Sequence, residues 1–514
     1  MKKIAIILSF SLLMASCTDW LDYKPFDEVS GDDVYRTEAL TGRALNGLYI
    51  RLAGSNLYGQ SMSVSTLEVL GQNFYWNGAT ASGTPALLAL GGYDYTSDNV
   101  KGLFSNIWNA SYRAIAEANE FLENVEKNKD NYSSAAYNLY MGEAIAIRTL
   151  LHFDLLRLFG PVPTPANYER PAIPYYNSST AAAQDIITAD SMMRVLMNDI
   201  DIAIEYMSND PILTSGLSAN LNLLDGHNYL TAFRNIHMNY YGVNALKARM
   251  ALWWGTPESR ELAYKIASRM IAGEDPRDPA KTTNFNQVFS FVSGSGGQGR
   301  FRVFYPEVLF GIHNTRITQV NRAMFTNEDG NGHLVVRDHF YNWLYTAAPA
   351  GPDGGIAGTG VRANMWTQEV TVANDGSEIR IFRRLTRTTS DTAYPHHPEF
   401  QGVIRLGELY LIAAETAPDV ETKRGYVARL RTGKGYGPGD NTGGVNEATL
   451  DQIIEMEFRK ETYGEGQWFF FAKRRNLASF RRATMNTAGG TPVAFTASWY
   501  TPPIPEQETD LRVD

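Results

Sequence analysis

The chain has 514 residues, with 55 Asp and Glu against 46 Lys and Arg and a formal net charge of −9 at neutral pH. An acidic chain without a stripe of Lys and Arg repels phosphates, which excludes nucleic acid as a partner. The single cysteine, Cys17, excludes an intramolecular disulfide, and the length is sufficient for a large buried core.

The first predicted element is a secretory signal over residues 1–16. It has two lysines, a mostly apolar run from Ile4 to Met14 and two small residues directly before Cys17. This run is too short to span a membrane as a mature helix. The spacing resembles a bacterial lipobox, in which Cys17 becomes the lipidated first residue of the mature chain. A cleaved signal followed by a chance cysteine is the alternative, but acyl chains on Cys17 would anchor the protein to a membrane.

Helices dominate the first half, because apolar residues recur there at the helical period. Gly160 and Pro161 end one of these helices, since proline cannot continue the hydrogen-bond ladder. Thr256 and Pro257, a capping residue followed by proline, mark the start of another. Helix pairs of this size with short turns predict a tetratricopeptide-like superhelix. The expected helices are Asn106–Val125, Ala135–Phe159, Ala189–Met207, Asn239–Trp254 and Ser259–Ile271.

The composition changes between residues 285 and 400, where Gly, Asn and Thr become frequent. We therefore predict an all-α protein with a helical part over 17–284, a loop-rich insert with short strands over 285–400, and a second helical part over 401–514. Loops on a rigid scaffold usually hold the binding residues. The expected strands are Phe301–Tyr305, Val308–Ile312 and Ile379–Leu385, and the later helices are Gly402–Thr416, Tyr426–Thr432 and Thr449–Tyr463.

Motifs for cofactors are weak in this chain. A G-x-G-x-x-G run at Gly294–Gly299 is followed by a predicted strand, whereas a dinucleotide site needs a helix there, so a surface loop is favoured. His396 and His397 lie between prolines without a third metal ligand placed by the sequence. We therefore predict no cofactor.

One segment follows the pattern of a calcium loop. Asn327, Asp329, Asn331 and Asp338 take positions 1, 3, 5 and 12, and oxygen ligands at alternate positions around a glycine suit a calcium ion. Position 1 is Asn rather than Asp, position 12 is Asp rather than Glu, and no strong helix flanks the loop. A turn between two strands is therefore favoured, with calcium as the alternative.

Three glutamates, Glu457, Glu461 and Glu465, lie at i, i+4 and i+8 near the last predicted helix. A glycosidase needs two carboxylates about a sugar bond, so Glu461 and Glu465 form the enzymatic alternative. Neighbouring bases favour instead a network of ion pairs with adjacent helices. These bases are Arg459, Lys460, Lys473, Arg474 and Arg475. Since HExxH, Walker and G-x-S-x-G motifs are missing from the sequence, we predict that the protein is not an enzyme.

Several segments, taken in order, resemble the SusD/RagB family of outer-membrane nutrient-binding lipoproteins. Relatives commonly have E-G-x-R and then D-L-x-R-W where this chain has Gly466-Gln467-Trp468 and Phe471-Ala472-Lys473-Arg474, which leaves the substrate class open. The segments are Cys17-Thr18-Asp19-Trp20-Leu21-Asp22, Asn46-Gly47-Leu48-Tyr49, Ile107-Trp108 with Tyr112 and Asn119, Phe159-Gly160-Pro161-Val162-Pro163, Arg405-Leu406-Gly407-Glu408-Leu409-Tyr410, and Glu457 to Gly466.

The resemblance implies a tetratricopeptide-like helical fold without catalysis, anchored in the outer membrane and facing the cell exterior. It also implies a partner, a SusC/RagA-like TonB-dependent barrel that the protein covers as a lid. The lid captures an oligomer and delivers it to the barrel for import. Glycan oligosaccharides are the favoured ligands, and oligopeptides are the alternative within the family. A structural adhesin that binds a protein on a host or neighbouring cell is a further alternative.

Binding in the resembled family relies on aromatic platforms in loops, with polar groups at their edges. By local chemistry we select Tyr75 and Trp76, which lie in a stretch rich in Gly, Ser and Thr, and Tyr341, Trp343 and Trp366 in the insert. Buried packing is the alternative for each of them. If Trp76 forms a platform, Trp76→Ala weakens ligand binding and leaves thermal stability nearly unchanged.

Overall fold

The structure is a computed structural model. It describes residues 33–78, 85–217, 230–292, 303–326, 333–345, 361–366, 370–373, 375–386, 399–436, 446–485, 487 and 491–510. Cys17, the Gly294–Gly299 run, Asn327, Asp329, Asn331, His396 and His397 therefore lie outside the described residues.

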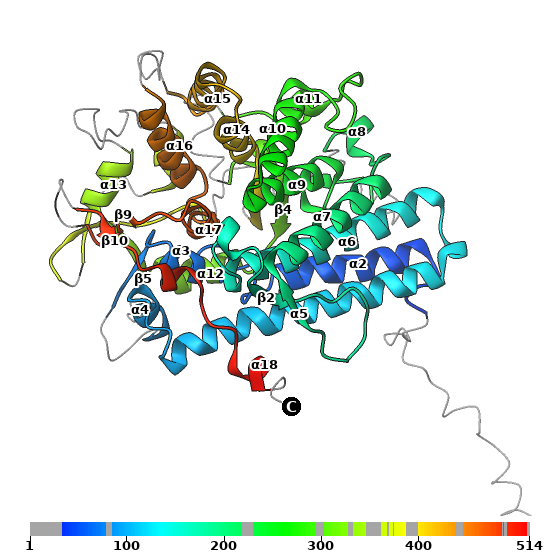
Figure 1. Cartoon of the computed structure of the whole chain (residues 1–514), viewed down its shortest axis with the longest axis horizontal. Coiled ribbons are helices and arrows are strands. Elements are labelled where there is room, and N and C mark those ends of the chain that lie inside the picture. The colour runs from blue at the N-terminus through cyan, green and yellow to red at the C-terminus, as the bar shows by residue number, and fades with distance from the viewer. Residues whose placement is uncertain are drawn as a thin grey trace, which may run out of the picture.

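The fold is mainly helical, as predicted, and tetratricopeptide-like (Figure 1). The α-helices of the described residues are α2 (Glu38–Leu52), α3 (Thr66–Leu70), α4 (Pro85–Gly91), α5 (Asp98–Lys127), α6 (Ser134–Phe159), α7 (Ala189–Tyr206), α8 (Ile212–Ser215), α9 (Tyr240–Trp254), α10 (Pro257–Ala272), α11 (Phe285–Val288), α12 (Ile317–Phe325), α13 (Asp338–Tyr345), α14 (Leu406–Glu415), α15 (Val420–Gly433), α16 (Glu447–Glu461), α17 (Gln467–Arg474) and α18 (Glu506–Asp510).

The strands are short and form small antiparallel sheets. β1, β5, β7 and β6 form one sheet in that order, and the remaining strands pair as β2 with β3, β4 with β8, and β9 with β10. The strands are β1 (Tyr75–Asn77), β2 (Pro171–Pro174), β3 (Ile186–Thr188), β4 (Val308–His313), β5 (His333–Arg337), β6 (Thr371–Val372), β7 (Glu378–Arg380), β8 (Phe400–Arg405), β9 (Ser479–Phe480) and β10 (Val493–Ala494).

The long helices α2, α5 and α6 pack side by side along the long axis of the molecule (Figure 1). Nearly all of α6 is buried. Its own sequence explains this, because apolar side chains lie on all sides of the helix. α5 buries Ile107, Trp108 and Ile115 on one face, while Asn106 and Asn109 on another are exposed. The polar face of α5 is therefore turned to solvent beside α2.

The helix boundaries follow local chemistry. The Thr256 hydroxyl accepts from the Ser259 backbone N–H at 3.1 Å and caps α10, and Pro257 opens the helix as predicted. α10 ends at Ala272, and Gly273 follows it with a φ of +78°, a conformation that favours glycine. α10 then packs on α9 and on α14, and α14 packs on α15, which continues the stack of helix pairs (Figure 1).

The strand predictions were partly wrong. The expected helix Gly402–Thr416 begins only at Leu406, because Phe400–Arg405 forms β8 and pairs with β4. All residues of Phe400–Arg405 are buried, so apolar and polar positions do not alternate along it. The hydrophobic pattern of such a short buried run therefore cannot distinguish a strand from a helix. The expected strand Val308–Ile312 is present as β4, and the expected strand Ile379–Leu385 is limited to β7. Phe304, in the described part of the expected strand Phe301–Tyr305, has a left-handed backbone and precedes a 3-10 turn.

One large apolar core joins the helical parts and the strand region. It includes side chains from α2, α5, α6, α9, α14 and α17 together with β4 and β5. Among the described residues, no helix is both long enough and apolar enough to cross a membrane.

Candidate functional site

The five aromatic residues predicted to bind ligand come from three parts of the sequence, and the structure brings them into one region. β1 holds Tyr75 and Trp76 and pairs antiparallel with β5, so that Trp76 lies opposite Leu334. α13, which holds Tyr341 and Trp343, follows β5 directly. The ring centroids of Tyr341 and Trp366 are 5.9 Å apart.

Most of these rings are packed inside the protein rather than on its surface. Trp76 and Tyr341 are 8% exposed, and Trp366 is 2% exposed. The Trp366 ring meets Tyr463 edge-on at 5.0 Å. The expectation of open platforms at these three positions is therefore corrected, because the rings are part of the large apolar core. Tyr75 and Trp343 are half-buried, and their contribution to ligand binding stays a prediction.

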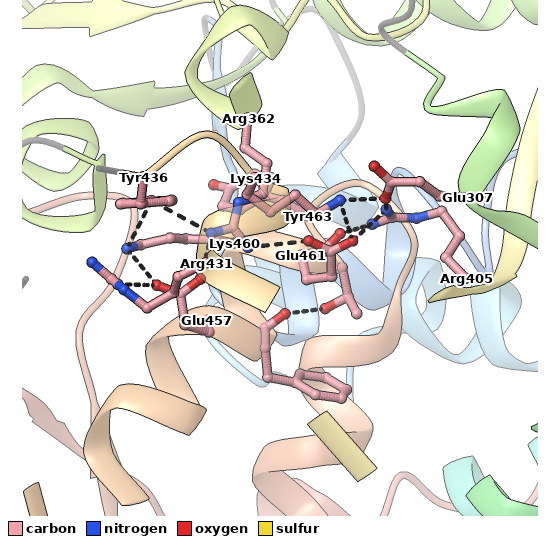
Figure 2. A network of polar contacts seen from close by, with 12 residues as sticks. Glu307, Arg362, Arg405, Arg431, Lys434, Tyr436, Glu457, Lys460, Glu461 and Tyr463 are labelled. Atoms are coloured by element: carbon pink, nitrogen blue, oxygen red, sulfur yellow. Dashed lines mark hydrogen bonds and ion pairs between the residues drawn. The ribbon is translucent and has the colours of Figure 1, made fainter. Parts of the chain in front are cut away.

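The three glutamates form buried ion pairs, as the structural hypothesis predicted, and Figure 2 shows those of Glu457 and Glu461. Glu457 pairs with Arg362 and with Arg431, whose Nη1 lies 2.7 Å from Glu457 Oε1. Glu461 Oε1 lies 2.5 Å from Arg405 Nη1 and 2.9 Å from Lys434 Nζ.

Glu465 lies beyond the last turn of α16, which ends at Glu461. Its Oε1 is 2.5 Å from Arg405 Nε, and it also pairs with Arg384. Arg405 further contacts Glu307 at 3.3 Å, so one guanidinium joins three carboxylates. We call the side chains of Glu307, Arg362, Arg384, Arg405, Arg431, Lys434, Glu457, Lys460, Glu461 and Glu465 the core ion-pair network.

Most of the bases that the sequence suggested as partners lie elsewhere, which corrects that part of the prediction. Lys460 does contact Glu457 at 3.3 Å, but Arg459 donates to Asn73 Oδ1 at 2.7 Å. Lys473 donates to the carbonyls of Leu158 and Gly160. Arg474 and Arg475 both pair with Glu415. Apart from Lys460, the partners of the three glutamates come from distant segments that helical spacing cannot identify.

The electrostatics of the network do not suit a general acid. Burial raises the pKa of Glu461, but Arg405, Lys434 and Arg362 outweigh it and hold this pKa well below its ordinary value. The pKa of Glu457 is lowered in the same way by Arg362, Lys460 and Arg431, against the effect of burial. A glycosidase acid needs a raised pKa and access to the sugar. The buried Glu461 and Glu465 therefore do not form the carboxylate pair of a glycosidase.

A groove of about 970 Å³ lies elsewhere, between α2, α5, the turn after α2 and the end of β4. We call it the α2–α5 groove. A smaller hollow of about 150 Å³ continues it past Asn314 and Arg316 toward α12. The groove is lined by Asn46, Gly47, Tyr49, Ile50, Arg51, residues 53–57, Asn106, Asn109, Ala110, Arg113, Ile236, His237, His313, Asn314, Thr315 and Arg316.

The described lining of the groove contains amides and bases but no Asp or Glu. Its α5 wall holds Asn106, Asn109 and Arg113, at i, i+3 and i+7 on the exposed face, together with Ala110. Its α2 wall holds Asn46 and Ile50, one helical turn apart. The sequence analysis used only the apolar faces of these helices. The signal that could have indicated the groove is the polar stripe on α5, which has no Asp or Glu although the chain has a negative net charge.

The positive charges at the groove differ in their partners. Arg51 Nε pairs with Glu117 Oε2 at 2.9 Å, and His313 Nε2 lies 3.0 Å from Glu399 Oε2. Arg113 and Arg316 are exposed, and neither side chain is within ion-pair distance of a carboxylate in the described parts of the chain. The groove therefore has two positive charges without a carboxylate partner.

The floor of the groove rests on a buried polar cluster. The Tyr49 hydroxyl donates to Glu143 Oε2 at 2.5 Å, and His237 Nδ1 lies 2.9 Å from the same oxygen. Arg234 is fully buried and pairs with Glu143 and with Asp210. Burial raises the pKa of Glu143, but Arg234 and His237 outweigh it and lower this pKa to about 2. The cluster fixes α2 against α6 beneath the groove.

Asp338, the described member of the possible calcium loop, is already held by protein groups. Arg380 Nε lies 2.6 Å from Asp338 Oδ1, and Asn342 donates to Oδ2 at 2.6 Å. Among the residues that the structure describes, no three His, Cys, Asp or Glu side chains gather closely enough to hold a metal ion. Calcium binding stays an untested alternative to the turn.

The sequence matches known proteins in its amino-terminal part. Residues 19–214 match a SusD-like family model described as starch-binding and associating with the outer membrane. A SusD-like protein of Formosa agariphila is 30% identical over 168 residues, which are 31% of this chain and 30% of the relative. The aligned segment therefore spans less than a third of that relative.

The fold matches solved structures over nearly the whole chain. A SusD superfamily protein of Bacteroides thetaiotaomicron is similar with a TM-score of 0.69 and 21% identity, over 92% of this chain and 98% of that protein. A SusD-like carbohydrate binding protein of Bacteroides vulgatus is similar with a TM-score of 0.63 and 15% identity, over 92% and 96% of the two chains. At these identities the likeness concerns the fold. The chain is therefore similar to SusD-like proteins in the sequence of residues 19–214 and in its fold.

Proposed function

We propose that this protein binds carbohydrate oligomers at the outer membrane and delivers them to a SusC/RagA-like TonB-dependent barrel. The α2–α5 groove carries the proposal. Its volume of about 970 Å³ lies at the upper end of the range for small-ligand sites, and its open form admits a chain. The fold around it is that of SusD superfamily proteins.

A carbohydrate ligand is favoured over a peptide by two observations. The matching family is described as starch-binding, and one protein of similar fold is described as carbohydrate binding. The side chains of Asn46, Asn106 and Asn109 make no hydrogen bond to the described parts of the protein. Each amide offers two donors and an acceptor, which suit the hydroxyl groups of a sugar.

The proposed location rests on the amino terminus. The lipobox-like spacing before Cys17 supports a lipid anchor at the outer membrane, and the family description supports association with that membrane. Metabolic labelling with a radioactive fatty acid tests the anchor. We expect label in the native protein and none in Cys17→Ser, and label in both variants would contradict the anchor.

Binding and delivery are tested separately. Isothermal titration of the mature chain with a panel of oligosaccharides and oligopeptides should give heat with at least one oligosaccharide. Chromatography of each mixture should show uncleaved oligomer. If only oligopeptides give heat, the proposed ligand class changes from glycan to oligopeptide. Cleavage of the oligomers would contradict a role in binding alone. Purification from its own membrane should yield a barrel-forming transporter, and recovery without one would contradict the proposed partner.

A further inference from the structure

We propose that the α2–α5 groove selects acidic oligosaccharides, whose sugars carry carboxylate or sulfate groups. This inference rests on the proposed function and narrows its ligand class. It starts from a charge difference, because the protein has a net charge of −9 while the described lining of the groove has three arginines, two histidines and no carboxylate.

The partners of these bases determine which charges a ligand meets. Arg51 pairs with Glu117, so its charge is largely compensated within the protein, and His313 lies beside Glu399. Arg113 comes from the middle of α5 and Arg316 from the turn between β4 and α12, and both are exposed without a carboxylate within ion-pair distance in the described chain. Charge within a concave wall is screened less than charge on a convex surface, because the protein excludes part of the counter-ion cloud.

The side-chain types suit an anionic sugar chain. A guanidinium forms two parallel hydrogen bonds with a carboxylate or a sulfate, which fixes the position and orientation of the anion. Asn46, Asn106 and Asn109 offer donors and acceptors for hydroxyl groups between the anions. Ile50, 65% exposed at the groove, offers an apolar contact for the C–H face of a sugar.

The groove lacks what usually holds a neutral glycan. Its described lining has one Tyr and no Phe or Trp, and this residue, Tyr49, is only 6% exposed with its hydroxyl bound to Glu143. A sugar ring therefore has no open aromatic face on which to stack. Charge and amide hydrogen bonds must provide the recognition instead.

A second hollow of about 520 Å³ has the opposite character. It lies among α7, α9 and α10, where the half-buried Trp254 donates through Nε1 to Asp190 at 3.0 Å. Its lining also contains Glu169 and Glu258, with Arg194 already paired to Asp190. The carboxylates of this hollow disfavour an anionic glycan, whereas the described lining of the α2–α5 groove has none.

The test uses matched pairs of probes in isothermal titration. One pair is a galacturonate hexamer and its neutral methyl ester, and the other is a sulfated carrageenan hexamer and its desulfated form. We expect one acidic probe to bind, and the response of the two pairs identifies carboxylate or sulfate as the group recognised. The neutral form of that probe should bind at least about tenfold more weakly, because it offers the two arginines no charged acceptor.

The double variant Arg113→Gln with Arg316→Gln locates the binding. We expect this variant to bind the acidic probe at least about tenfold more weakly than the native chain. We also expect its Kd to depend less on the salt concentration. The matched control is Arg43→Gln with Arg170→Gln, which removes two exposed arginines that do not line the groove and should leave the Kd unchanged. Equal loss in both double variants would mean a non-specific charge effect and would overturn the inference.

Two further outcomes separate this inference from the proposed function. Binding of neutral glycans with equal or better affinity, or an unchanged Kd in the groove variant, would overturn the inference and leave glycan capture intact. If neither probe pair nor the wider glycan panel binds the native chain, both the inference and the proposed function fail.

Discussion

Arginine side chains occupy two very different regions of this molecule. In the core ion-pair network, Arg405 is buried and contacts Glu307, Glu461 and Glu465. In the α2–α5 groove, Arg113 and Arg316 are exposed and have no carboxylate at ion-pair distance among the described residues. The same residue type therefore stabilises the fold in one region and is available to a ligand in the other.

The difference follows from the cost of desolvation. A buried guanidinium is stable only when carboxylates and carbonyl groups replace its water, and each member of such a network depends on the others. An exposed guanidinium keeps its water and costs the fold little. Removing charge from the network should therefore change stability without a specific effect on binding, and removing charge from the groove should do the reverse.

Acid should produce the largest effect, because it acts on many buried carboxylates at once. Burial raises the pKa of Glu415, but Arg474 and Arg475 outweigh it and lower this pKa to about 2, as happens for Glu143. A carboxylate with a lowered folded-state pKa contributes stability above its unfolded pKa of about 4.5, and this stability is lost as the pH falls toward 2. We expect a loss of roughly 3 kcal/mol for each of these two groups.

Urea unfolding followed by tryptophan fluorescence between pH 7 and pH 2.5 measures this loss. The midpoint should decrease steadily below about pH 5. A midpoint that stays constant down to pH 3 would show that the buried pairs do not depend on ionised carboxylates.

Arg405→Ala should give the largest effect of a single substitution. It leaves Glu307, Glu461 and Glu465 buried with one cation fewer, and breaking a buried pair usually costs about 3–5 kcal/mol. The free energy of unfolding measures the loss. Arg113→Ala is the matched control and should change this free energy by less than about 0.5 kcal/mol. Equal losses in the two variants would remove the distinction between the network and the groove.

Trp76→Ala extends the comparison from charged to aromatic side chains. The sequence favoured a ligand platform with little effect on stability, but the ring is buried beside the β1–β5 pairing. We now expect the free energy of unfolding to decrease by at least about 3 kcal/mol, as for a large core aromatic residue. Tyr75→Ala, at a half-buried ring in the same strand, should cost less. A thermal melt of Trp76→Ala that matches the native protein would restore the platform interpretation.

Much of the fold could be predicted because its signals are local. The apolar period identified α6 and α9 to within one residue at their ends, and Thr256 with Pro257 located the start of α10. Residues 402–405 of β8 were predicted as helix, because the feature that marks them as strand is the pairing with β4, about ninety residues earlier in the chain. Non-local pairing of this kind leaves no period in the sequence.

The site was harder to predict for the same reason. The i, i+4 spacing of Glu457 and Glu461 correctly indicated ion pairs, yet the partners Arg362 and Arg405 come from other segments. The aromatic residues were selected by local chemistry, but the burial of Trp366 depends on contacts with Tyr341 and Tyr463 from other segments. The groove was missed because its walls belong to two helices and a turn that only the folded chain brings together.

Gly47→Gln should give the smallest change in stability and tests the groove by steric obstruction. Gly47 lies within α2 and lines the groove, and a Cβ built there meets no atom within 4 Å. Replacing a glycine inside a helix stabilises the helix by about 0.5–1 kcal/mol. The new side chain also occupies the groove, so the Kd for the acidic probe should rise at least about tenfold.

Gly425→Gln is the control that separates these two effects. Gly425 is exposed on α15, and a Cβ there also meets no atom within 4 Å, but this residue is not part of the groove. Both variants should unfold at slightly higher urea concentration than the native chain, and only Gly47→Gln should lose ligand. A variant that is more stable and yet binds less cannot have lost ligand through unfolding. Unchanged binding in Gly47→Gln would therefore place the ligand outside the α2–α5 groove.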